Sequence, residues 1–137
     1  MSYLLDTNVL IGCLRGHQSL VHAVETRGRG QDLAISSITY GELMVGILKK
    51  DSPRRRAALR KVLAPMTILP FDRDAGIEFA RIKADLEQSG EVIGPYDLQI
   101  AGHAVASGRR LVTHNSTEFS RVKDLDWVDW EAEADDA

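Results

Sequence analysis

Short apolar runs alternate with longer amphipathic stretches along this chain. We expect strands at residues 3–5, 33–36, 66–71, 110–115 and 127–130, and helices at 9–14, 17–27, 40–50, 53 onwards, 72 onwards and 96–107. Ser37 or Thr39 is expected to cap the helix at 40–50. Strands that alternate with helices form a parallel sheet, because each helix carries the chain back to the same edge. The sequence therefore predicts an α/β fold with a short, mostly parallel sheet covered by helices on both faces.

Length and composition limit the class of protein further. The 137 residues fit one domain, which we expect to cover residues 1–130, followed by an acidic, disordered tail at 131–137. Cys13 is the only cysteine, which excludes an internal disulfide and a cysteine zinc site. The absence of a basic leader and of a long apolar run predicts a cytoplasmic protein.

Acidic residues follow the ends of the expected strands or lie in the helices after them. Asp6 follows the first strand, Glu42 lies in the helix after the second, and Asp97 opens a helix after a Gly-Pro turn. Glu118 follows the fourth strand. Taken alone, each could equally be a helix cap, a first-turn acid or a solvated surface residue.

Together these acids indicate a site for a hard divalent cation. The carboxyl ends of parallel strands meet at one edge of the sheet, so we expect the acids to gather there. Carboxylates crowded in a dry cleft repel one another, and a bound cation removes that conflict. Oxygen ligands without His or Cys suit Mg²⁺, for which Mn²⁺ can substitute. Such a cation serves phosphate chemistry, because it lowers the pKa of a water molecule and neutralises charge at phosphorus.

Other phosphate-handling classes lack their motifs here. No Gly-x-x-x-x-Gly-Lys-Ser/Thr loop is present, which argues against a P-loop NTPase. A phosphatase with an aspartate nucleophile would need a second aspartate where this chain has Asn8. Two histidines suggest acid–base catalysis, but His103 lies six residues after Asp97 and so points away from it, which predicts a core or surface role. His114 flanks the expected site and is a candidate for contact with substrate.

Four segments together resemble the PIN-domain ribonucleases and, more narrowly, the VapC toxins of bacterial toxin–antitoxin pairs. They read LLDTNVLI, ISSITYGELMVG, GPYDLQIAGHA and LVTHNSTEFSRV, and their order and spacing match that family from about residue 3 to residue 130. The resemblance implies a PIN-like three-layer α/β/α fold. It also implies a Mg²⁺-dependent endoribonuclease, the toxin of a type II toxin–antitoxin module, which cuts structured RNA, expected to be tRNA.

The resemblance also implies a role for each acid. Asp6 and Asp97 would bind the metal, Glu42 would act through water or as general base, and Glu118 would be a fourth catalytic acid. Many PIN domains have a further aspartate where this chain has Asn115, so one cation rather than two is expected. The groups implied to support the metal ligands or orient phosphate are Thr7, Asn8, Thr113 and Asn115.

Partners follow from the same resemblance. A cognate VapB-like antitoxin would occupy a groove beside the site and inhibit the enzyme, and DNA would be reached only through the antitoxin. A homodimer would use apolar helix faces around Met44 and Ile47, and the complex with antitoxin would be a heterotetramer or larger. The alternative is a PIN domain that binds RNA or a partner without cleaving anything.

A basic stretch, KKDSPRRRAALRK at residues 49–61, contrasts with the net charge of −3. It is either a solvated helix face or a surface that binds the RNA backbone. An acidic site would need such a surface, because carboxylates alone repel phosphate. The candidates for RNA contact are Arg54, Arg55, Arg56 and Arg60.

Overall fold

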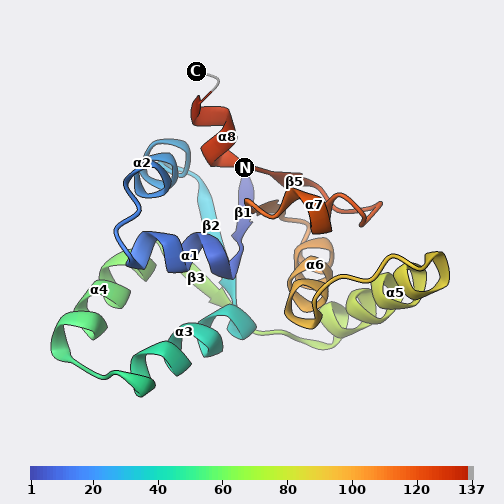
Figure 1. Ribbon diagram of the computed structural model, residues 1–137, viewed down its shortest axis with the longest axis horizontal. Helices are drawn as coiled ribbons and strands as arrows, with labels where there is room; N and C mark the ends of the chain where they lie inside the picture. Colours follow the sequence, from blue (N-terminus) through green and yellow to red (C-terminus); the bar gives the residue numbers. More distant parts are fainter. Residues whose placement is uncertain (136–137) are drawn as a thin grey trace.

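The computed structural model describes residues 1–135 and shows a five-stranded parallel sheet with helices on both faces (Figure 1). The strands are β1 Ser2–Leu5, β2 Asp32–Ser36, β3 Met66–Leu69, β4 Arg110–Val112 and β5 Trp127–Val128. The helices are α1 Thr7–Leu14, α2 Gln18–Arg27, α3 Ser37–Lys49, α4 Pro53–Leu63, α5 Arg73–Ser89, α6 Pro95–Ser107, α7 Ser116–Phe119 and α8 Trp130–Asp135. The predicted fold class is confirmed.

The order of the strands creates a crevice at the centre of the sheet. The order is β3-β2-β1-β4-β5, and every pair is parallel. Strands β2 and β3 are added on one side of β1. The chain then crosses over, and β4 and β5 are added on the other side of β1. In open parallel sheets, ligands bind at the carboxyl ends of the strands where the direction of building reverses. The segments that follow β1, β2 and β4 therefore face one another at this edge.

Alternate residues of the central strands enter two separate hydrophobic cores. Leu4 and Leu111 pack with α5, α6 and α7, whereas Leu5 and Val112 pack with the helices of the other layer, α1 to α4 and α8. Figure 1 shows these two groups of helices on opposite sides of the sheet. Because both faces are covered, the strands read as continuous apolar runs rather than as alternating patterns.

Helix α6 is held at a defined place between α5 and α3. A Cβ at Gly102 would lie 2.6 Å from the backbone nitrogen of Phe79, so only glycine permits this approach of α6 to α5. The neighbouring His103 is buried, as expected of a core residue, and its Nδ1 lies 2.8 Å from Oγ of Ser36. Ser36 is the N-cap of α3, so this bond ties α6 to α3. Burial also lowers the pKa of His103, which keeps the imidazole neutral.

The cap of α3 differs from the expected one. Ser36, rather than Ser37 or Thr39, caps this helix, because its Oγ accepts a hydrogen bond from the backbone N–H of Ile38. Ser37 instead accepts a hydrogen bond from the backbone N–H of Phe71. The strand and the helix thus join one residue earlier than the sequence pattern suggested.

The C-terminal part also differs from expectation, because α7 and α8 were not predicted. The expected disordered tail at 131–137 begins inside α8, while residues 136–137 lie outside the described part. Trp130, the first residue of α8, is 3% exposed and packs edge-to-face on Tyr3 at 4.9 Å between ring centres. No helix within residues 1–135 is long and apolar enough to cross a membrane.

Candidate active site

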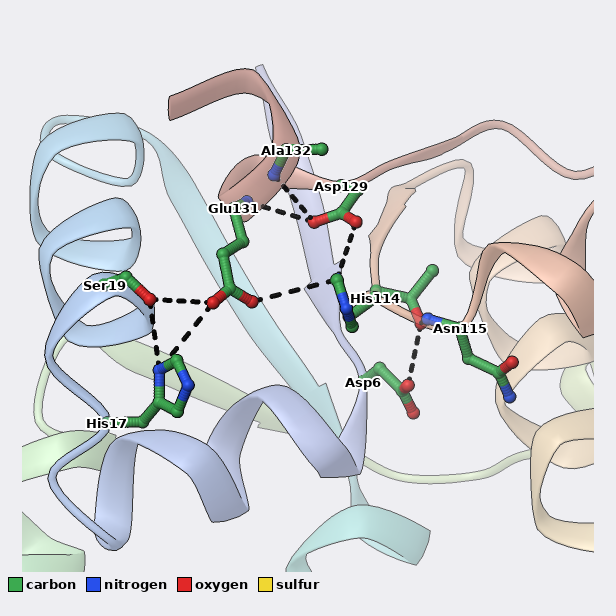
Figure 2. Close-up of polar contacts among 9 residues, drawn as sticks. Asp6, His17, Ser19, His114, Asn115, Asp129, Glu131 and Ala132 are labelled. Atoms are coloured by element: carbon green, nitrogen blue, oxygen red, sulfur yellow. Dashed lines mark hydrogen bonds and ion pairs between the residues drawn. The ribbon is translucent and has the colours of Figure 1, made fainter. Parts of the chain in front are cut away.

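Asp6 joins β1 to α1 and is 1% exposed. Its backbone carbonyl accepts a hydrogen bond from Val9 in α1, but its side chain makes no capping bond within the described chain. Instead, Oδ2 accepts a 2.9 Å hydrogen bond from the hydroxyl of Thr113, which follows β4 (Figure 2). Burial raises the pKa of Asp6, and the bond from Thr113 opposes that rise. A side-chain cap of α1 therefore does not explain why a carboxylate is buried here.

Glu42 lies on α3 and lines the same cavity as Asp6. Its Oε1 is buried and has no hydrogen-bond partner among the described residues. Burial, and secondly the negative charge of Asp6, raise the pKa of Glu42. A buried carboxylate oxygen without a donor is costly, so this atom points to a role in binding or catalysis.

Asp97 lies in the first turn of α6, which begins at Pro95. Its Oδ2 accepts a 3.3 Å hydrogen bond from the side-chain amide of Asn115, and its carboxyl group is also hydrogen-bonded to Glu118. Burial, this bond to Glu118 and the charges of the neighbouring acids raise the pKa of Asp97 to about 7. Near neutral pH this carboxyl group is therefore poised between its protonated and ionised forms.

Glu118 lies on α7 and forms hydrogen bonds with Asn115, with Asp97 and with the turn before α6. Its Oε2 accepts a 3.1 Å hydrogen bond from the amide of Asn115, and its carboxylate also accepts one from the backbone N–H of Gly94. The hydrogen bond with Asp97 lowers the pKa of Glu118. Of the two carboxyl groups, Asp97 is therefore the one that holds a proton to the higher pH.

One cavity of about 230 Å³ connects three of the four acids. Its lining residues are Asp6, Thr7, Asn8, Glu42, Gly94, Pro95, Tyr96, Asp97 and Ile100. The hydroxyl of Thr7 lies 2.8 Å from that of Thr39 and links α1 to α3. Sequence reasoning missed Thr39, Tyr96 and Ile100; the Gly-Pro turn before Asp97 was the available signal for Tyr96.

The chemistry of these groups fits a hard divalent cation. The donors are carboxylate oxygens, one of them the orphaned Oε1 of Glu42, and the neighbouring negative charges contribute to the raised pKa of Asp97. Among residues 1–135 as they stand, no group of three or more Asp, Glu, His or Cys side chains is arranged to hold an ion. Because its pKa is raised to about 7, Asp97 would bind a cation in competition with a proton near neutral pH.

The basic stretch divides into two groups. Arg55 donates to backbone carbonyls at the end of α3, and Arg56 forms two 2.7 Å hydrogen bonds with Asp51. These contacts hold the connection between α3 and α4. Arg54 and Arg60 lie on α4 with exposed side chains. The structure thus gives Arg55 and Arg56 structural contacts and leaves Arg54 and Arg60 the more accessible candidates for RNA contact.

Comparison with known proteins identifies the family. The PIN domain family model matches residues 3–125. The chain is 34% identical to Ribonuclease VapC2 of Rickettsia felis, over 96% of this chain and 99% of that protein, and 34% identical to tRNA(fMet)-specific endonuclease VapC of Shigella flexneri, over 95% and 98%. A crystal structure of VapBC2 from Rickettsia felis bound to a promoter DNA fragment matches with a TM-score of 0.86 at 33% identity, covering 95% of this chain and 99% of that chain. This chain therefore belongs to the PIN-domain family and, within it, to the VapC ribonucleases.

Proposed function

We propose that this chain is the toxin of a type II toxin–antitoxin module and a Mg²⁺-dependent endoribonuclease that cuts tRNA. The observation that carries the proposal is the gathering of Asp6, Glu42 and Asp97 around one cavity at the carboxyl edge of the sheet. PIN-domain nucleases use divalent metal ions, and the Shigella flexneri relative is named as a tRNA(fMet)-specific endonuclease. The identity to that relative supports tRNA as the substrate class.

Each acid has its own role in the proposed reaction. Asp6 and Asp97 hold the cation, which would supply positive charge against the phosphate and lower the pKa of a water molecule. Glu42 takes a proton from the attacking water, a role that suits a carboxylate whose pKa is raised and whose Oε1 has no partner among the described residues. A new bond would join the water oxygen to phosphorus while the bond from phosphorus to the 3′ oxygen breaks. The departing 3′ oxygen would take a proton from solvent water, which leaves 5′-phosphate and 3′-hydroxyl ends. Glu118 is the fourth acid.

Neighbouring polar groups keep these acids in place. Thr113 holds Asp6 and Asn115 holds Asp97 through the hydrogen bonds already described. Thr7 links α1 to α3 through its buried bond to Thr39, and both Thr7 and Asn8 line the cavity. Phosphate groups farther along the RNA would reach exposed basic side chains on α4, namely Arg54 and Arg60.

The direct test uses the purified chain, free of antitoxin, with end-labelled total tRNA in Mg²⁺, Mn²⁺ or EDTA. Asp97→Asn serves as the inactive variant, and Asp85→Asn, the same chemical change at an exposed position on α5, serves as the matched control. Discrete products that require the cation, persist in the control and vanish in Asp97→Asn are expected. Equal cleavage by Asp97→Asn would expose a contaminating nuclease. No cleavage by the wild type, with no metal bound in calorimetry, would indicate a PIN domain that binds without cutting.

We also propose that a VapB-like antitoxin occupies a groove that leads out of the catalytic cavity. Glu42 lines both that cavity and a neighbouring one of about 280 Å³ between α1, α3 and α4. Leu14 and Ala58 then connect this second cavity to a larger, mainly apolar one of about 610 Å³. The VapBC complexes among the similar structures support an antitoxin partner and indirect contact with DNA. An antitoxin segment that follows the groove would reach Glu42 and block the site. Co-purification with a Leu14→Asp variant, which should lose the antitoxin, tests this placement.

The expected dimer surface needs revision. Ile47 is 3% exposed and packs in the core of its own chain, so it cannot face a second copy. The exposed apolar residues of α3 are instead Val45 and Leu48, at 51% and 65% exposure. We propose these two as part of the surface for a homodimer, within a heterotetramer or larger complex with antitoxin. An unchanged mass of a Val45→Asp, Leu48→Asp variant in analytical ultracentrifugation would contradict that placement.

A further inference from the structure

The loop between β4 and α7 makes direct contacts to three of the four acids. Thr113 donates a 2.9 Å hydrogen bond to Asp6, and the amide of Asn115 donates to Asp97 and to Glu118 at 3.3 and 3.1 Å. The backbone N–H of Asn115 also donates to the hydroxyl of Thr113 at 3.0 Å. This short loop therefore contributes to the placement of three carboxyl groups.

The middle residue of the loop, His114, points away from the acids and toward α8. Its Nδ1–H donates a 2.8 Å hydrogen bond to Oδ2 of Asp129, and Oε2 of Glu131 lies 3.8 Å from the same nitrogen. Figure 2 shows His114 beside these two acids, with Asn115 directed to the opposite side of the loop. The side chain of His114 is 69% exposed, so it contributes little buried surface to the fold.

The anchor for His114 is itself well held. Oδ1 of Asp129 accepts hydrogen bonds from the backbone N–H groups of Glu131 and Ala132 at 3.1 and 3.2 Å, which fixes its carboxylate at the start of α8. Glu131 accepts a 2.7 Å hydrogen bond from the hydroxyl of Ser19 on α2 and lies 3.7 Å from His17 (Figure 2). Helix α8 is thus tied to α2, and two backbone hydrogen bonds hold the partner of His114 at the start of this helix.

We propose that His114 is a positioning residue for the nuclease site: its bond to Asp129 sets the loop that places Asp6, Asp97 and Glu118. The proposal rests on the proposed nuclease function. Displacing catalytic groups by about 1 Å can cost about a hundredfold in rate, and loss of groups that orient metal ligands typically costs about 10- to 100-fold in activity or metal affinity. An exposed histidine can therefore matter for catalysis while contributing little to stability.

The test compares His114→Ala with His114→Asn, because the amide nitrogen of asparagine can take the place of Nδ1 and keep the bond to Asp129. Arg110→Ala is the matched control. It breaks the 3.0 Å pair between Arg110 and Asp126 at the opposite end of β4 and β5, and it touches none of the acids. For each variant, kcat and KM for tRNA cleavage, the Kd for Mn²⁺ by calorimetry and the Tm are measured.

We expect His114→Ala to lower kcat about tenfold and weaken Mn²⁺ binding about tenfold, with KM unchanged and Tm within about 2 °C of the wild type. His114→Asn should restore both to within about threefold of the wild type, and Arg110→Ala should leave them unchanged. Unchanged kcat and Mn²⁺ affinity in His114→Ala, or an equal loss in Arg110→Ala, would overturn the proposal. So would a rise in KM alone, because His114 would then contact RNA directly.

The Mn²⁺ measurement also separates the two proposals. If the wild type cuts no RNA, the proposed function fails, but the Mn²⁺ affinities of the two His114 variants still decide whether this residue positions the acids. If the wild type cuts RNA and His114→Ala behaves like it in every measurement, only the positioning role fails.

Discussion

Replacing Asp97 by asparagine should stabilise the metal-free protein at pH 8 while abolishing cleavage. The folded state raises the pKa of Asp97 to about 7 from an ordinary value of 3.8. Between these two values the folded chain keeps a proton that the unfolded chain has lost, so the free energy of unfolding falls as pH rises through this window. Asparagine cannot ionise, and its amide can still donate a hydrogen bond to Glu118. The free energy of unfolding of the variant therefore does not show the decrease with rising pH that Asp97 causes in the wild type.

The magnitude follows from the same pKa. Raising it from 3.8 to about 7 corresponds to at most about 4 kcal/mol. Asp97 is only partly buried, so water screens much of this penalty. We expect the variant to gain about 1–2 kcal/mol on the wild type between pH 5 and pH 8.

Urea unfolding in EDTA at pH 5 and pH 8, followed by tryptophan fluorescence, measures this gain. Asp85→Asn on the exposed surface of α5 should give the same difference from the wild type at both pH values, within about 0.5 kcal/mol. If the advantage of Asp97→Asn over the wild type does not grow between pH 5 and pH 8, the raised pKa of Asp97 in the folded state is wrong.

Three further perturbations test other parts of the structure. Mn²⁺ affinity should rise between pH 6 and pH 8, because the ion competes with a proton for Asp97; titrations in two buffers of different protonation enthalpy would reveal the released proton. Gly102→Ala should destabilise the fold by about 2 kcal/mol or more, because the new Cβ would meet the backbone of α5, whereas Gly76→Ala, with open space around it, should stabilise by about 0.5–1 kcal/mol; urea unfolding distinguishes them. His103→Ala should cost about 2–3 kcal/mol, because it leaves a cavity and removes a buried bond to Ser36; an unchanged urea midpoint would contradict this.

The local pattern of residues was sufficient to predict most of the strands and helices. Each expected strand and each long helix has its counterpart, because apolar periodicity and start and stop residues act over a few neighbours. The helices that escaped prediction are short: α7 has four residues and α8 six. Such short helices are stabilised by tertiary contacts, which in α8 include the burial of Trp130. A segment of four or six residues is too short to show the hydrophobic periodicity from which a helix is predicted.

The sequence by itself determined that acids follow the strands of a parallel sheet, and the topology of such a sheet leaves them one edge at which to meet. Only the tertiary structure decided what each acid contacts there. Thr113 reaches Asp6 across 107 positions of sequence, and Glu42 keeps an oxygen without a partner among the described residues. A hydrogen bond to Glu118 contributes to the raised pKa of Asp97, and His114 turns toward α8 rather than toward the acids. These properties depend on burial and on atoms brought together from distant segments, which no local pattern of residues encodes.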